Sequence, residues 1–234
     1  MADIVVNKEP TKKSTEPITP KNAVKFSFTL TYILLLTTAT ITFIEAIRTK
    51  SPVVRHVLNL ETCISVVAGY FYSVFITKIE SDPIDWKQLT QTRYIDWSIT
   101  TPMMLLALCI VLSNEIGQSI YLHVFLLIVG LNYAMLYIGY LGETGVLTRT
   151  VADIAGFIPF IAMFSVIYYN FVRPKYSFAN RVLFGMYLAI WSMYGFVYLL
   201  DENTKNMAMN LLDATAKCLV GLGLWAYYVH IVKI

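Results

Sequence analysis

The chain has 234 residues, of which 57% are hydrophobic and 14% are charged, with a formal net charge of +3. This apolar share exceeds the roughly one half that is usual in soluble domains, which indicates a protein embedded in a lipid bilayer. The basic residues are scattered over segment ends, so nucleic acid is not expected as a partner. The three cysteines lie inside apolar stretches, and their odd number predicts neither a disulfide framework nor a metal knuckle.

The N-terminal residues 1–23 are polar and contain three prolines, which predicts a flexible extension. Seven apolar stretches follow, each long enough to cross the hydrocarbon core as a helix of about 20 residues. Their expected bounds are residues 24–47, 54–77, 92–112, 119–141, 150–172, 178–200 and 207–231. Thr19 and Pro20 suit a helix cap and first turn, so the first helix could also begin before residue 24. No signal peptide is expected, because no charged and then apolar leader precedes the first stretch.

The basic residues of the loops predict the orientation of the chain. The loops after the first and fifth stretches each carry three lysines or arginines, whereas the loops after the second, fourth and sixth mix acids with bases. Because lysine and arginine resist translocation, the N-terminus is expected outside and the C-terminus in the cytoplasm. The fold class is therefore an all-α membrane protein with seven transmembrane helices, and its short loops make neighbouring helices antiparallel.

A lysine near the centre of the seventh stretch is the first candidate site residue. An ammonium group at this depth is costly, so Lys217 indicates a functional site unless it only forms a structural ion pair with Asp213, one turn earlier. A second acid, Asp96, occurs in the third stretch near Arg93, which favours the functional interpretation. A buried lysine readily loses its proton, and the free amine condenses with an aldehyde to give an imine.

Aromatic residues of different stretches could form the walls of a slot for a conjugated aldehyde. Trp97, Trp191 and Tyr194 are the candidates, although each taken alone is more often an ordinary core residue. Together with the lysine and the two acids, they predict a bound polyene.

Three motifs resemble the microbial, or type 1, rhodopsin family, and the likeness extends over residues 24–232, which form the predicted retinal-binding domain. The motifs are Arg93-Tyr94-x-Asp96-Trp97-x-x-Thr100-Thr101-Pro102, Trp191-Ser192-x-Tyr194 and Leu212-Asp213-x-x-Ala216-Lys217. The resemblance implies that Lys217 carries all-trans retinal as a protonated Schiff base, with Asp96 as primary proton acceptor and Asp213 as second counterion. The short loops and the N-terminal extension most resemble the viral branch of the family.

The resemblance assigns further residues to the site. It places three side chains in the counterion network: Arg93, Thr100 and Tyr194. It places five others around the retinal: Tyr94, Trp97, Thr101, Met104 and Trp191. Met104 occupies the family's tuning position, which implies absorption of green rather than blue light.

The chain departs from the family where ion transport is decided. Proton pumps of the family usually have a carboxylic acid eleven residues after the acceptor, where this chain has Ala107. Asn203 and Lys205 fall about where acids that release protons are expected, and Gly195 stands where the family has a proline. An efficient pump is therefore less expected.

Two glutamates in the cytoplasmic half could compensate for the missing acid. Glu61 could replace the donor, or form a polar constriction with Asn59, Thr62 and Asn210. Glu45 ends the first stretch, where a solvated helix end explains it better than an ion pathway, although it stays a candidate.

We interpret the protein as a light-gated cation channel, with an outward light-driven proton pump as the alternative and a light sensor third. A transporter without pigment would not need the aromatic slot. Asp153 is interpreted as an interface acid paired with Arg149 rather than a vestibule residue. Neither an enzyme nor a metal site is expected, since hydrolase motifs and metal-ligand spacings are missing. The expected partners are the lipid bilayer, monovalent cations or protons, and further copies of the chain, in a plasma membrane or host-cell membrane.

Overall fold

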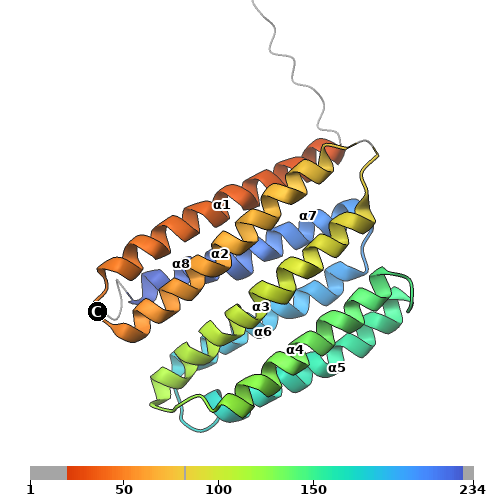
Figure 1. Cartoon of the computed structure of the whole chain (residues 1–234). Coiled ribbons are helices and arrows are strands. Elements are labelled where there is room, and N and C mark those ends of the chain that lie inside the picture. The colour runs from red at the N-terminus through yellow and green to blue at the C-terminus, as the bar shows by residue number, and fades with distance from the viewer. Residues whose placement is uncertain (1–19, 82, 229–234) are drawn as a thin grey trace, which may run out of the picture.

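The computed structural model describes residues 20–81 and 83–228 (Figure 1). The chain forms α1 (Pro20–Arg48), α2 (Pro52–Ile79), α3 (Trp86–Ile116), α4 (Leu122–Glu143), α5 (Arg149–Ile167), η1 (Tyr168–Val172), α6 (Phe178–Tyr198), α7 (Glu202–Asp213), η2 (Ala214–Leu219) and α8 (Val220–Ala226). Because η1 continues α5, and η2 and α8 continue α7, these elements make seven helical segments. The described residues contain no strand, and the predicted all-α fold class is confirmed.

The helix ends differ from the predicted ones where polar residues form a first turn. α3 begins six residues before the predicted residue 92, because the Asp85 side chain caps it by accepting from Gln88 N at 2.9 Å. α7 likewise begins at Glu202, since Asp201 accepts from Thr204 N at 3.1 Å. α1 already begins at Pro20, so residues 20–23 are helical, while residues 1–19 of the predicted extension lie outside the described residues.

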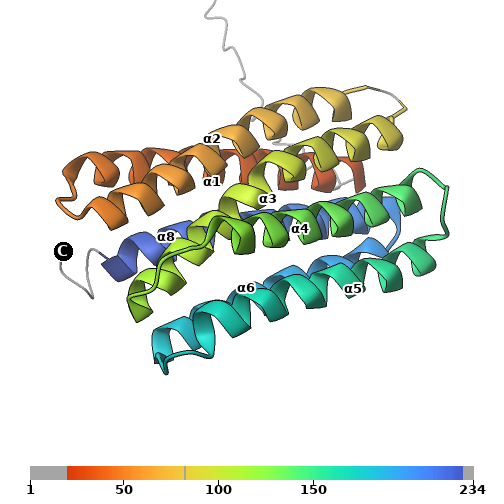
Figure 2. The same ribbon diagram turned by 60° about the horizontal axis from the view of Figure 1, so that its bottom comes forward.

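Consecutive helices run antiparallel and close into a ring, as the two views show (Figures 1 and 2). α1 packs against α2, α2 against α3, α3 against α4 and α4 against α5; α6 then connects α5 with α7, which returns to α1. α5 and α7 therefore lie on different sides of α6. This ring surrounds the centre of the bundle, where the polar site residues are buried.

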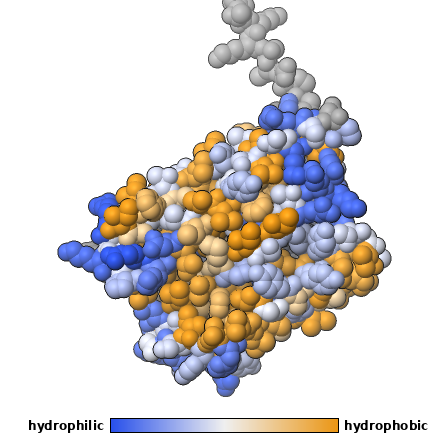
Figure 3. Space-filling model, in the orientation of Figure 1, coloured by the Kyte–Doolittle hydropathy of each residue, from blue (hydrophilic) through white to orange (hydrophobic). Residues whose placement is uncertain are grey.

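The surface has the character that a bilayer requires. Apolar side chains cover the middle of the molecule, and polar residues gather at its two ends (Figure 3). On α5, for example, Ile154, Ile158 and Ile161 are all exposed. Six described helices are long and apolar enough to cross a membrane. The other segment, α6, is less apolar by sequence because it contains Asn180, Arg181, a tryptophan and three tyrosines; Tyr187 and Trp191 are among those that are buried.

Two segments depart from regular α-helical hydrogen bonding. Pro102 lies inside α3 and cannot donate to the carbonyl of Ser98, four residues earlier. The Tyr133 hydroxyl of α4 donates to that carbonyl instead, at 3.0 Å. In the last segment, η2 is a π-helical turn that contains Lys217, and such turns are rare and often occur at functional sites.

Candidate functional site

Lys217 is buried between two carboxylates. Its Nζ lies 2.9 Å from Asp96 Oδ2 and 3.8 Å from Asp213 Oδ1. The three side chains have 1% exposure or less, so nearly all their hydration is lost. Charges this deep are tolerated only when opposite charges compensate them. The pairing predicted from the spacing of Asp213 and Lys217 and from the third helix is therefore present.

Arg93 supplies the second positive charge. Its NH1 lies 3.3 Å from Asp213 Oδ2, while its NH2 donates to Asn206 Oδ1 at 3.2 Å and to Asn210 Oδ1 at 2.8 Å. The guanidinium also lies over the ring of Phe75, 5.1 Å from its centroid. Two carboxylates are thus balanced by one lysine and one arginine.

The two carboxylates have different surroundings. Asp213 accepts hydrogen bonds from Tyr194 at 2.7 Å, Tyr72 at 2.8 Å and Trp97 Nε1 at 3.3 Å, besides its contacts with the two cations. Asp96 Oδ2 is bound by Lys217, and its Oδ1 has no partner among the described residues. Asp213 is therefore held as a fixed anion, while Asp96 has an oxygen available for a proton.

Two threonines of α3 do not bind the carboxylates. Thr100 Oγ1 donates to the backbone carbonyl of Asp96 at 2.9 Å, so it supports the helix rather than the Asp96 side chain. Thr101 Oγ1 donates to the Trp97 carbonyl and accepts from Asn132 Nδ2 at 2.8 Å. Their hydroxyls are satisfied by α3 itself and by α4.

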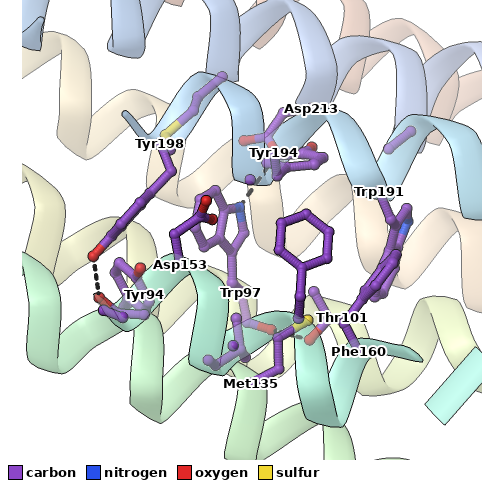
Figure 4. A pocket seen from close by; sticks show the side chains of 18 of the residues that line it. Tyr94, Trp97, Thr101, Met135, Asp153, Phe160, Trp191, Tyr194, Tyr198 and Asp213 are labelled. Atoms are coloured by element: carbon purple, nitrogen blue, oxygen red, sulfur yellow. Dashed lines mark hydrogen bonds between the residues drawn. The ribbon is translucent and has the colours of Figure 1, made fainter. Parts of the chain in front are cut away.

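A cavity lined by Lys217 extends to α4 and α5. Figure 4 shows some of its walls, among them Trp97, Asp153 and Trp191. The cavity encloses about 830 Å³ of space between protein atoms, including its opening, and its walls come from α3, α4, α5, α6 and the last segment. All five residues expected around the chromophore line it: Tyr94, Trp97, Thr101, Met104 and Trp191. A buried amine at one wall of an aromatic cavity suits a long conjugated aldehyde, so these residues fit retinal.

Glu61 lies on the side of Lys217 away from Arg93. It is 2% exposed, and its Oε1 has no partner among the described residues. Its Oε2 lies 2.8 Å from the place where a Cβ on Gly221 would stand, and Gly221 is four residues after Lys217. Asn210, seven residues before Lys217, instead contacts Arg93.

The four residues expected to form one constriction, Glu61, Asn59, Thr62 and Asn210, do not lie together, so that prediction is wrong. Asn59 is exposed, and Thr62 is 2.8 Å from Thr42 of α1. Hydropathy gives the depth of a residue but not the rotation of its helix, so the four residues could not be grouped from sequence.

Two other acids, Asp153 and Glu45, do not have the surroundings expected for their predicted roles. The expected Asp153–Arg149 pair is wrong, because Arg149 contacts Glu143 and Glu202 while Asp153 lines the cavity. Glu45 lies near the end of α1, and one of its oxygens is 3.7 Å from Arg48. The Glu45 side chain is 14% exposed and Arg48 is 72% exposed, and this pair offers no link from Glu45 to Lys217.

A cluster of four charges, missed in the sequence, lies beyond Arg93. Lys205 Nζ lies 2.9 Å from Glu143 Oε1 and 3.1 Å from Glu202 Oε1, and Arg149 binds the same two glutamates. Asn206 connects this cluster to the site, since it donates to the Glu202 carbonyl at 2.8 Å and accepts from Arg93. Only the spacing of Glu202 and Lys205 along one helix could have indicated the cluster.

Tyr72 of α2 was also missed. It donates to Asp213 and, at 3.1 Å, to Asn210. Among described residues, no group of three or more His, Cys, Asp or Glu side chains could hold a metal ion.

A seven-helix membrane bundle, a buried lysine with two acids and an adjoining aromatic cavity define the class of retinal-binding photoactive membrane proteins. The chain matches the model of the Bacteriorhodopsin-like protein family over residues 22–231 and belongs to that family. It is 44% identical to the crystal structure of viral rhodopsin OLPVRII, with a TM-score of 0.82, over 89% of this chain and 98% of that chain. It is accordingly a microbial rhodopsin of the viral branch.

Two curated relatives are more distant. Bacteriorhodopsin of Halobacterium salinarum is 27% identical over 198 residues, which cover 76% of this chain and 68% of the relative. A green-light absorbing proteorhodopsin of a gamma-proteobacterium is 27% identical over 153 residues, which cover 58% of this chain and 60% of the relative. Family membership makes the chain an integral membrane protein that binds retinal as its chromophore and acts as a light-driven ion transporter or sensor.

Proposed function

We propose that the protein transports protons in light, from the side of Glu61 to the side of Arg93, with retinal attached to Lys217. One observation carries this proposal: Lys217 Nζ has a carboxyl group on each side. Asp96 lies 2.9 Å from it on the Arg93 side. On the other side, the buried carboxyl group of Glu61 lies beside Gly221, one helical turn after Lys217, and its Oε1 has no partner among the described residues. When bound, retinal supplies light absorption and the isomerisation that reorients the nitrogen. The residues on either side then determine where its proton goes.

Asp96 is the proton acceptor in this proposal. Its Oδ2 already forms a hydrogen bond with Lys217 Nζ, and its Oδ1 has no partner among the described residues. Asp213 is less suitable, because the side chains of Arg93, Tyr72 and Tyr194 bind the anion and would have to give up these contacts. Asp213 keeps the second negative charge that Arg93 balances.

Glu61 is the internal donor. A carboxyl group buried without a cation is most stable when it keeps its proton, so Glu61 holds one in reserve. Movement of that proton to Lys217 Nζ resets the site. This role replaces the acid that the family's pumps have at the place of Ala107, which is fully buried here.

The exit leads through Arg93, Asn206 and the four-charge cluster. Glu143, Arg149 and Glu202 of this cluster also line a second hollow, which opens beside Trp86 and Lys87 at the start of α3. With the N-terminus outside, as the basic loops predict, this hollow faces outward and the transport is outward.

A light-gated cation channel is the second candidate, and it is the one the sequence favoured. Polar residues between α1, α2 and α7 support it: Asn210 Nδ2 donates to Ser27 at 2.9 Å, and Thr31 donates to the Asn210 carbonyl at 3.2 Å. Buried polar side chains continue toward Glu61 on α1 and α2, where Thr38, Thr42 and Ser65 are all buried. Beyond Glu61, the bundle is filled by an apolar cluster that includes Leu58, Leu108 and Leu224, so a pore would need a larger rearrangement there.

Voltage clamp of membranes supplied with retinal, under green light, separates the two. A current that keeps its direction across potentials supports the pump, whereas one that reverses with the sodium or potassium gradient supports the channel. Glu61→Gln should slow the recovery of the pump, and Glu45→Gln, which changes a carboxylate paired with Arg48, is the matched control. An unchanged Glu61→Gln photocurrent contradicts the donor role.

A further inference from the structure

The carboxylate of Asp153 lies on the wall of the chromophore cavity, and it has no role in the proposed proton transport. It lines the cavity from α5 (Figure 4), and Lys217 lines the same cavity from the last segment. α5 packs against α4 and α6, and α7 packs against α1 and α6, so the two walls lie across the bundle from each other. A chromophore attached at Lys217 and filling the cavity therefore has its free end near the α5 wall.

Gly195 of α6 makes room for this carboxylate. A Cβ on Gly195 would stand 3.1 Å from Asp153 Oδ1 and 2.5 Å from the ring of Phe157. A larger residue would displace both side chains of α5. Gly195, which stands where the family has a proline, therefore leaves the space that the Asp153 carboxylate occupies.

The charge of Asp153 is not neutralised locally. Its carboxylate forms no hydrogen bond or ion pair with any described residue, and Arg149, one turn earlier, is bound by Glu143 and Glu202. On α6, Tyr198 uses its hydroxyl to donate to the Gly139 carbonyl at 2.8 Å. The negative charge of the Asp153 carboxylate therefore acts on a molecule that fills the cavity.

We propose that Asp153 sets the colour of the pigment by holding a negative charge at the end of the cavity far from Lys217. The inference rests on the proposed attachment of retinal at Lys217. Light absorption moves positive charge along a conjugated chain, away from a cationic nitrogen. A carboxylate at the far end stabilises the excited state more than the ground state, which lengthens the absorbed wavelength. Asp96 and Asp213, beside the nitrogen, act in the opposite direction.

The test uses the full chain, purified and reconstituted with all-trans retinal. Asp153→Asn keeps the shape and removes the charge, so its absorption maximum should move to shorter wavelength by on the order of 10 nm. Asp153→Glu, which keeps the charge, should move the maximum less. Glu115→Gln, at the exposed end of α3 and outside the cavity, should leave it unchanged.

The outcomes distinguish this inference from the proposed function. A wild-type chain that stays colourless contradicts retinal attachment, whereas a coloured Asp153→Asn variant with an unmoved or longer-wavelength maximum overturns only the role of Asp153. If Asp153→Asn does not assemble, the wild-type pigment is titrated from about pH 8 to about pH 4. Protonation of Asp153 should shorten the wavelength, whereas protonation of Asp96 or Asp213 lengthens it. The nearby Tyr94, Tyr198 and Arg149 keep their protons throughout, so a titration without any shortening overturns the inference.

Discussion

Lys217 Nζ lies 2.9 Å from Asp96 Oδ2, across 121 positions of the chain, and this contact joins the last helical segment to α3. Asp213, only four residues from Lys217, is the more distant partner at 3.8 Å. The nitrogen is therefore directed toward the carboxylate that has a free oxygen.

Replacing Lys217 should abolish the pigment. Lys217→Ala lacks the amine, and Lys217→Arg keeps the charge without a group that condenses with an aldehyde, so neither should show a visible band with retinal. Asp96→Asn, which keeps Lys217, should still bind retinal but lose light-driven transport. A visible band that persists in Lys217→Ala, measured by absorption spectroscopy, would place the attachment elsewhere.

Gly221→Ala should disturb Glu61. The added methyl group would stand 2.8 Å from Glu61 Oε2, so the carboxyl group must move away from its resting place. We expect the last step of the light cycle to slow by about tenfold, the effect of roughly 1.4 kcal/mol on its barrier. Flash spectroscopy measures this step. Gly223→Ala is the matched control, since a Cβ there meets no atom within 4 Å, and equal kinetics in both variants would refute the prediction.

Lys205→Met should destabilise the fold. Lys205 binds both oxygens of Glu143, whose side chain is 5% exposed, and the variant leaves that carboxylate without its nearest cation. Leaving a buried charge without any partner costs about 3–5 kcal/mol, and the loss here should be smaller because Arg149 still contacts Glu143 at 3.1 Å. The double variant Glu143→Gln with Lys205→Met should recover part of this loss. The measurement is the temperature at which the visible band disappears. A double variant that loses its band at a lower temperature than Lys205→Met would contradict the pairing.

Tyr133→Phe should weaken the packing of α4 on α3. Pro102 cannot donate to the Ser98 carbonyl, and the variant removes the Tyr133 hydroxyl that does, so the loss should be about 0.5–1.5 kcal/mol, as for an ordinary hydrogen bond. Pro102→Ala restores a backbone N–H at that turn. The same thermal assay should therefore show a smaller effect of Tyr133→Phe in the Pro102→Ala background than in the wild type. Equal effects in both backgrounds would show that the hydrogen bond does not matter.

The sequence determined the features that depend on spacing along one helix. A span of hydrocarbon requires about 20 apolar residues, so all seven segments could be located, with errors where capped polar turns extend α3 and α7. The four-residue spacing of Asp213 and Lys217 fixed their common face. The motifs of three helices also identified the family and its retinal.

Only the tertiary structure decided which distant residues meet. Asn210 belongs with Arg93 and not with Glu61, Tyr72 binds Asp213, and Asp153 faces the cavity instead of Arg149. These contacts depend on the rotation of each helix about its own axis. That rotation is set by packing against several neighbours at once, and a pattern of apolar residues within one helix leaves it undetermined.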